Sequence, residues 1–188
     1  LLIGTPLRGG VLENYVHNTD ASYSWQVREN KVMDGLDVAT LDLTSQTWRG
    51  GRWTHTLYIA RPRVLRNPSF AFLEIMARAG KEFLPTVKLL AERSGALVAV
   101  VTDVPNQPLF ENKWEDALIA YTFDQYLKTG DETWPLLLPM TKSAVRAMDA
   151  VQAWALAERG QNVDRFAVSG ASKRGWTTWL AGAVDKRV

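Results

Sequence analysis

The stretch that most constrains this chain is a serine framed by glycines, where a short β-type run meets a run that suits a helix. The apolar run at 165–168 leads into Gly170, Ser172 and Gly175, and helix-compatible residues then continue to Val184. Because glycine has no Cβ, it permits a tight turn and close packing of a strand against a helix. The pattern predicts a strand, a sharp turn and a helix, with Ser172 lifted out at the carboxyl end of the strand.

The pattern leaves two interpretations of Ser172 open. An α/β-hydrolase presents its nucleophile on such a turn, although here the second glycine follows the serine by three positions and not by two. The simpler alternative is a serine in an ordinary strand-to-helix turn, or a cap on the N-terminus of the following helix.

Hydrophobic periodicity predicts strands that alternate with helices. The expected strands are 38–48, 53–59, 70–76, 96–102 and 165–168, and the expected helices are 81–93, 114–127, 141–158 and 173–184. The first two strands form a hairpin, and the later alternation predicts a mixed, mostly parallel sheet with helices on both faces. We therefore expect an α/β fold, a three-layer αβα sandwich of the α/β-hydrolase type, in which Ser172 follows the fifth strand. The last two strands are expected to be adjacent, central and buried.

The domain organisation follows from where periodicity begins. Residues 1–33 contain scattered aromatic residues without a sustained period, so we expect an extended N-terminal arm. Residues 34–188 are interpreted as the N-terminal portion of one α/β-hydrolase domain, truncated after the nucleophile helix. The reason is that such a fold needs further strands to carry its acid and its histidine.

Composition narrows the possible partners. The chain has 46% hydrophobic and 22% charged residues, and its 22 basic and 20 acidic side chains form no basic patch, so no nucleic-acid partner is expected. It contains no cysteine, which excludes disulfides, thiolate metal sites and a cysteine nucleophile. No apolar run approaches the roughly 20 residues of a transmembrane helix. No motif indicates a cofactor or a metal, and neither is expected.

A serine nucleophile needs a base, usually a histidine held by a carboxylate. The two histidines, His17 and His55, both precede Ser172, whereas the order in α/β-hydrolases is serine, acid, histidine. We expect His17 at the surface, His55 in a structural role, and both imidazoles more than about 8 Å from the serine hydroxyl. Asp185 is too near the elbow to be the acid and is expected as a surface carboxylate. The acid and the histidine are therefore expected outside this chain, which alone should be inactive.

An oxyanion hole needs N–H donors beside the serine. The backbone N–H of Lys173, at the positive end of its helix, is the first candidate. The Lys173 ammonium either adds a charged donor or is simply solvated. A second backbone donor is expected from the loop after the third strand, which reads Arg78-Ala79-Gly80 and lacks the usual glycine-rich run.

Four polar side chains follow the fourth expected strand, at the end of the sheet where open α/β folds bind ligands. Asn106, Gln107, Glu115 and Asp116 either line a polar substrate pocket or satisfy loops and helix caps. Glu115 and Asp116 are adjacent on a helix and are expected to face apart, which argues against a paired acid–base or metal site.

The chain has eight tryptophans, and Trp176 and Trp179 share one face of the expected elbow helix. Exposed indole rings would offer a stacking platform for carbohydrate, whereas buried ones would pack in the core. We prefer core packing.

The sequence resembles the PhoPQ-activated pathogenicity-related proteins, an α/β-hydrolase-like family. The run Gly-Ala-Ser-Lys-Arg-Gly-Trp-Thr-Thr-Trp-Leu at 170–180 carries the resemblance, which extends to segments 14–16, 23–25, 41–48, 104–109, 115–121 and 139–142. A more distant resemblance, confined to the elbow, is to glucuronoyl esterases, which also place a basic residue after the serine; it implies that Lys173 assists at the oxyanion. Family membership also implies export to the periplasm or the exterior.

The leading hypothesis is a serine hydrolase of the esterase type, with Ser172 as nucleophile, Lys173 in the oxyanion hole and a small-molecule or carbohydrate-linked ester as substrate. The alternative is a hydrolase-shaped protein without catalysis, which serves in binding or signalling linked to virulence regulation. Two features favour this alternative: the absence of a glycine-rich run in the loop after the third strand, and a family name that records regulation and no chemistry.

Overall fold

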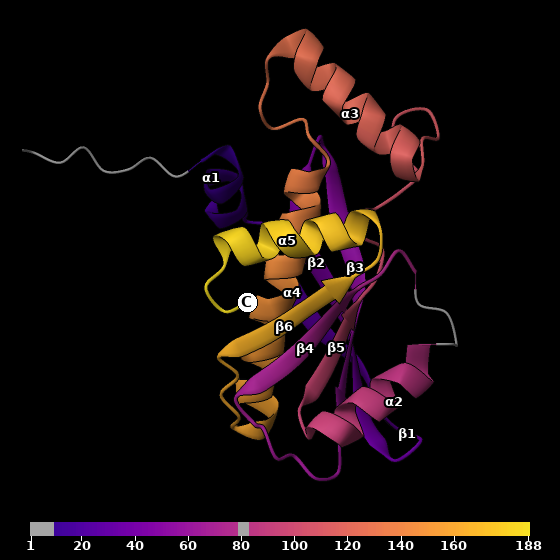
Figure 1. Cartoon of the computed structure of the whole chain (residues 1–188), viewed down its shortest axis with the longest axis vertical. Helices are drawn as coiled ribbons and strands as arrows, with labels where there is room; N and C mark the ends of the chain where they lie inside the picture. The colour runs from indigo at the N-terminus through magenta and orange to yellow at the C-terminus, as the bar shows by residue number, and fades with distance from the viewer. Residues whose placement is uncertain (1–9, 79–82) are drawn as a thin grey trace, which may run out of the picture.

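A computed structural model describes residues 10–78 and 83–188 (Figure 1). In chain order, the described elements are α1 (Val11–His17), β1 (Ser24–Met33), β2 (Leu36–Trp48), β3 (Gly51–Arg61), β4 (Phe70–Ile75), α2 (Phe83–Ser94), β5 (Leu97–Val101), α3 (Glu115–Thr129), α4 (Leu137–Arg159), β6 (Arg165–Gly170) and α5 (Lys173–Val184). The expected alternation of strands and helices after a hairpin is confirmed. The first two residues of the expected helix 81–93 lie outside the described residues.

The strands form one mixed sheet in the order β1-β2-β3-β5-β4-β6. The pairs β1–β2, β2–β3 and β3–β5 are antiparallel, whereas β4 is parallel to both β5 and β6. The expected adjacency of the fourth and fifth predicted strands is therefore wrong, because β4 lies between β5 and β6. A buried aliphatic run indicates that a strand is covered on both faces, but it carries no information about the strand's neighbours.

The position of β6 also differs from the expectation of a buried central strand. Among the described strands, β6 is last in the order, and Arg165 and Ser169 are exposed. By contrast, every residue of β5 is buried. The β-type run at 165–168 correctly predicted a strand. The expectation that this strand is central and buried is wrong.

The expectation of an extended N-terminal arm at residues 1–33 is wrong for the described part, residues 10–33. Residues 24–33 form β1, which pairs along its length with β2 and has a bulge between Val27 and Glu29, and residues 11–17 form α1. Most of β1 is exposed, so it lacks the alternation of apolar and polar residues from which a strand is recognised. As a result, six described strands precede Ser172, and not five.

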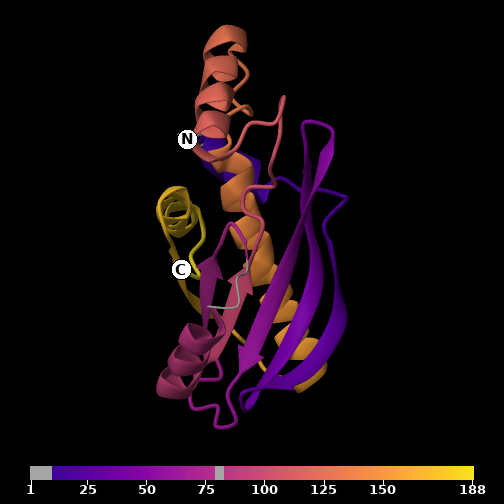
Figure 2. The same ribbon diagram turned by 90° about the vertical axis from the view of Figure 1, so that its right-hand side faces the viewer.

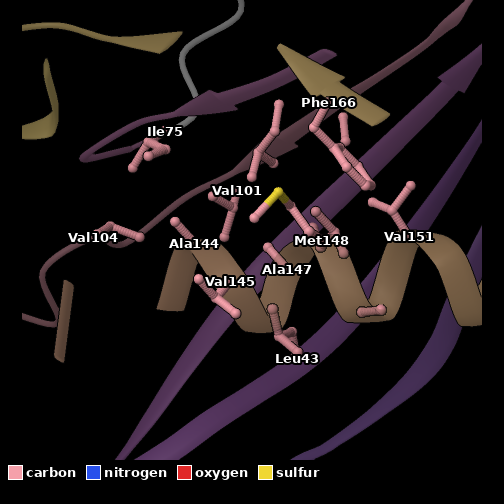
Figure 3. Packing of buried hydrophobic residues seen from close by; sticks show 14 of the residues in the cluster. Leu43, Ile75, Val101, Val104, Ala144, Val145, Ala147, Met148, Val151 and Phe166 are labelled. Atoms are coloured by element: carbon pink, nitrogen blue, oxygen red, sulfur yellow. The ribbon is translucent and has the colours of Figure 1, made fainter. Parts of the chain in front are cut away.

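The sheet is covered on both faces, which confirms the three-layer α/β fold (Figures 1 and 2). On one face, α4 packs in the larger core, where Ala144, Met148 and Val151 meet sheet residues such as Leu43 and Val101 (Figure 3). On the other face, α2 packs its Val87 and Ala91 against a smaller cluster. The expected helix 141–158 begins earlier, at Leu137, because Pro139 falls in its first turn, where proline is tolerated.

Helix α3 projects from the sheet instead of lying on it (Figures 1 and 2). An aromatic cluster joins its middle to the β2–β3 hairpin: Phe110 contacts Tyr121, Trp134 and Trp48 with ring centroids 5.0, 5.6 and 5.8 Å apart. The Arg49 guanidinium caps this cluster, 3.9 Å from the Trp134 ring centroid. The cluster therefore holds α3 above the carboxyl ends of the parallel strands.

Candidate active site around Ser172

The backbone at Ser172 has the geometry that exposes a nucleophile. Between β6 and α5, Ser172 has φ 57° and ψ −123°, a combination that residues with a Cβ rarely adopt. The residue is exposed, and its carbonyl accepts a hydrogen bond from the Trp176 N–H at 3.1 Å, so α5 begins immediately after it. The predicted strand, turn and helix are confirmed.

Both glycines are required by close approach. A Cβ on Gly170 would lie 2.7 Å from Arg174 Cβ and 2.9 Å from the Arg174 carbonyl, and a Cβ on Gly175 would lie 2.9 Å from the Gly170 carbonyl oxygen. Real Cβ atoms do not tolerate contacts with backbone at such distances. The two glycines therefore allow the first turn of α5 to pack against the end of β6.

The side chain of Lys173 is neither solvated nor directed freely at an oxyanion. It is only 8% exposed, and its Nζ lies 2.6 Å from Glu115 Oε2 and 2.9 Å from Asp116 Oδ1. Burial opposes the charged form, but hydrogen bonds to both carboxylates outweigh it and raise the Lys173 pKa. Both sequence interpretations of the ammonium are therefore corrected, and so is the expectation that Glu115 and Asp116 diverge.

Arg174 is the site residue that sequence reasoning missed. Its guanidinium binds Glu115 through two hydrogen bonds of 2.8 and 2.6 Å, while its Nε donates to the Val104 carbonyl at 2.7 Å. The Arg174 hydrogen bonds, together with those from Lys173 and Gln107, hold the Glu115 pKa far below its usual range despite partial burial. This cluster ties the start of α3 and the loop after β5 to the first turn of the elbow helix.

Asn106 and Gln107 satisfy loops and lie away from the cleft at the serine. Asn106 bridges to β3, where it accepts from the Thr54 N–H at 2.8 Å and donates to the Thr54 carbonyl at 2.9 Å. Gln107 accepts from the Glu115 backbone N–H at 2.9 Å and donates to its carboxylate. Both residues also line a polar pocket of about 420 Å³ whose lining does not include Ser172. Asn106 and Gln107 therefore satisfy loops and line a polar pocket that is separate from the serine.

The tryptophans of α5 are not core residues, which corrects the preferred interpretation. Trp176 is 48% exposed and Trp179 is 82% exposed. Trp176 stacks with Phe123 of α3, with ring centroids 6.5 Å apart and planes 22° apart. A shallow cleft of about 320 Å³ lies between these helices and is lined by Asp116, Ile119, Ala120, Ser172, Lys173 and Trp176.

His55 has a structural role, as expected. It is 4% exposed, and its Nδ1–H donates to the Thr102 carbonyl at 2.9 Å, which leaves Nε2 to accept from the Ser45 hydroxyl at 2.9 Å. Desolvation by burial lowers the His55 pKa to about 4. Three strand spacings separate β3 from β6, a distance of about 14 Å, so this imidazole is remote from Ser172.

His17 is at the surface, as expected. Its Nε2 lies 3.0 Å from the carbonyl oxygen of Val184, at the end of α5 opposite to Ser172. A helix of 12 residues is about 18 Å long, so His17 is also far beyond hydrogen-bond reach of the serine hydroxyl.

Asp185 is buried, contrary to the expectation of a surface carboxylate. It forms two hydrogen bonds with the Arg187 guanidinium, of 2.9 and 2.6 Å, and Arg187 also pairs with Asp149 of α4 at 2.8 Å. The Asp185 pKa is lowered, because the hydrogen bonds from Arg187 outweigh the effect of burial. The carboxylate therefore fixes the segment after α5 against α4.

The oxyanion donors can be placed only in part. The N–H groups in the first turn of a helix have no partner within the helix, and Lys173 is the first residue of α5, directly after Ser172. Of the loop expected to supply the second donor, Ala79 and Gly80 lie outside the described residues. Arg78, just before them, lies 5.2 Å from the Trp114 ring.

Residues 10–78 and 83–188 offer neither a metal-binding cluster nor a membrane-spanning helix. Neither range contains a group of three or more histidine, cysteine, aspartate or glutamate side chains placed to hold a metal ion. No helix in these ranges combines the length and apolar character needed to span a bilayer.

The fold and the elbow together define an esterase-like α/β-hydrolase fold. Among solved structures, the chain is similar to a glucuronoyl esterase from Solibacter usitatus, with 13% identity and a TM-score of 0.58. It is also similar to an acetyl xylan esterase from Paenibacillus sp. R4, with 13% identity and a TM-score of 0.60. Each match covers 94% of this chain and 54% of the other.

Within this class, the chain belongs to the PhoPQ-activated pathogenicity-related protein family, whose model matches residues 12–188. It is 35% identical over 193 residues to Autocrine proliferation repressor protein A of Dictyostelium discoideum. That match covers 94% of this chain and 39% of the relative. Both resemblances noted in the sequence are confirmed, and the chain spans well under two thirds of the proteins it matches.

Proposed function

We propose that the protein containing this chain is a serine hydrolase of the esterase type, with Ser172 as its nucleophile. The observation that carries the proposal is the exposed serine at positive φ, between a parallel strand and a helix that two glycines allow to meet. A strained backbone at an exposed nucleophilic side chain persists only where the surrounding structure imposes it, and such strain concentrates at active sites.

The proposed reaction is ester hydrolysis in two steps. The Ser172 Oγ attacks the ester carbonyl, its proton passes to a base, and the alcohol leaves with that proton. Water then displaces the acyl group from the serine and releases a carboxylic acid. The Lys173 N–H stabilises the oxyanion in both steps. The proposal needs no cofactor.

The base and its carboxylate are proposed to come from residues outside these 188. Neither histidine of the chain approaches Ser172, and the chain spans 54% of the esterases that it resembles. In this proposal, residues 34–188 are the N-terminal portion of one hydrolase domain, and the 188-residue chain alone is inactive.

The substrate class follows from the neighbours in fold. These neighbours are a glucuronoyl esterase and an acetyl xylan esterase. For this family member we propose a small-molecule or carbohydrate-linked ester. Export to the periplasm or the exterior, where such esters occur, remains part of the proposal.

A fluorophosphonate probe tests the nucleophile in the full-length protein. We expect labelling of the native protein and none of Ser172→Ala, because the probe reacts only with an activated serine. Ser169→Ala is the matched control, since Ser169 is an exposed serine on the preceding strand β6, and its hydroxyl donates a hydrogen bond to Glu74. Equal labelling of native protein and Ser172→Ala would contradict the assignment, as would absence of labelling.

A second candidate function is binding or signalling without catalysis. It is favoured by the distance of both histidines from Ser172 and by the name of the Dictyostelium discoideum relative, Autocrine proliferation repressor protein A. A link to virulence regulation belongs to the same candidate, since the family name records it. Full-length protein that is folded but unlabelled and inactive on esters would support this candidate over the hydrolase.

A further inference from the structure

The cleft beside Ser172 has a composition that indicates what it binds. It lies between α3 and α5, has a volume of about 320 Å³, and opens to solvent next to the exposed serine. Small-molecule sites in proteins begin at roughly 300 Å³, so the cleft fits one ring or a short chain and no oligomer.

The two sides of the cleft come from α3 and from the start of α5. On α3, Asp116, Ile119, Ala120 and Phe123 are spaced i, i+3, i+4 and i+7 and so share one face, which is apolar except for Asp116. The opposite side is formed by Ser172, Lys173 and Trp176, of which Trp176 supplies the apolar surface. Trp176 stacks with Phe123, yet the residue remains 48% exposed.

The charges at the cleft cancel one another. Lys173 and Arg174 supply two positive charges, and Glu115 and Asp116 supply two negative charges, all in direct ion pairs. No unpaired cation of this cluster is left to attract an anionic substrate. Asp116 lines the cleft and is already paired with Lys173, so a carboxylate on a substrate would find no free positive charge there.

We propose that this cleft binds the apolar group of an uncharged ester, an aryl or short alkyl group that stacks on Trp176 while its ester carbonyl reaches Ser172. The inference rests on the proposed serine hydrolase function and adds the substrate class. Trp176 determines specificity through an aromatic face, and the lack of a free cation disfavours carboxylate-bearing analogues. Trp179, which follows Trp176 on the same helix but does not line the cleft, has no part in this recognition.

The first test measures how esters protect the full-length protein from fluorophosphonate labelling. Methyl benzoate should slow labelling strongly, whereas monomethyl terephthalate, the same ester with an added carboxylate, should need roughly tenfold higher concentration.

Trp176→Ala should weaken protection by methyl benzoate roughly tenfold, because the ring contact is lost. Trp179→Ala, the matched control, should leave protection unchanged. Asp116→Asn should narrow the difference between the two esters.

The outcomes separate this inference from the proposed function. Labelling that neither ester affects, or that Trp176→Ala and Trp179→Ala alter equally, overturns the cleft assignment and leaves the hydrolase standing. Absence of labelling overturns the hydrolase, and the cleft is then tested in Ser172→Ala by saturation-transfer NMR with methyl benzoate. A signal that Trp176→Ala removes and Trp179→Ala retains supports the cleft; a signal that is absent or unaffected by either change refutes it.

Discussion

The backbone conformation of Ser172 depends on two nearby glycines, which have no side-chain atoms to keep β6 and α5 apart. Gly170 and Gly175 let the backbone of α5 approach the end of β6 within ordinary contact distances. The serine then takes positive φ because the chain must reverse between these two close elements. The close packing that stabilises the elbow therefore also leaves Ser172 exposed.

Gly170→Val tests this dependence. The new Cβ would meet the Arg174 backbone at 2.9 Å, so the variant should lose several kcal/mol of unfolding free energy, on the order of 3. Gly182→Ala, in α5, is the control, since its Cβ would meet only Val188 Cγ1 at 3.5 Å, and it should be neutral or stabilising. Chemical denaturation measures both; equal stability of native protein and Gly170→Val would contradict the close-approach argument.

His55 gives the fold a pH dependence with a defined sign. Burial lowers its pKa to about 4, while an unfolded histidine titrates near 6.5. Between these values the unfolded chain binds a proton that the folded chain excludes, so stability should fall as pH falls from 6.5 to 4. The loss should be about 3 kcal/mol at most. His55→Gln should remove this part of the slope and His17→Gln should not, as measured by urea titrations at several pH values.

Helix α3 projects from the sheet and is held by contacts that include the Phe123–Trp176 stack, an aromatic cluster and ion pairs. The aromatic cluster around Phe110 holds its middle, and the ion pairs of Glu115 hold its first turn against α5. Because two cations converge on one carboxylate, Glu115 decides where the α3 wall of the cleft stands relative to Ser172.

Glu115→Gln should therefore loosen α3. Lys173 and Arg174 are both buried and would each lose a charged partner, but Glu115 itself is 37% exposed, so we expect a loss of about 1–3 kcal/mol. Proteolysis should become faster at the loop before α3. Asp116→Asn, which changes a carboxylate that is 90% exposed, should cost less than about 0.5 kcal/mol. Equal effects of the two changes would show that Glu115 does not hold the first turn of α3 against α5.

For the molecule as a whole, the difference in burial between the interior of the sheet and its β6 edge matters most. Strand β5 is buried on every residue, whereas β6 is last in the described order and is partly exposed. On its outer side, the Phe166 N–H donates to the Arg187 carbonyl at 2.7 Å. Since alternate residues of a strand point their N–H groups to the same side, the Val168 N–H also faces outward.

Amide hydrogen exchange of the 188-residue chain should distinguish the two sides of β6. The Val168 amide should exchange at least about tenfold faster than the amide of Ala167, which faces β4. An open strand edge of this kind also favours pairing between copies. Slow exchange at both positions would mean that another segment or a second copy covers this edge in solution.

The sequence predicted those parts of the fold whose signal is local. Alternation in β3, the aliphatic run of β5 and the glycines of the elbow each reflect the surroundings of a few neighbouring residues, and all three were assigned correctly. Strand β1 was missed because its exposed residues carry no alternation. The burial of Asp185 was missed because its partner Arg187 is itself paired with Asp149, which belongs to the distant helix α4.

The sequence by itself determined that Ser172 stands on a strand–turn–helix elbow of an α/β fold, because backbone sterics act between residues a few positions apart. Only the tertiary structure decided that β4 separates β5 from β6, and that Glu115 and Asp116 converge on Lys173. Strand order and ion pairing depend on contacts between segments that are distant in the sequence, and the local spacing of residues does not predict such contacts. The charge of the cleft beside the serine, and hence the substrate class inferred for it, therefore belongs to the folded protein.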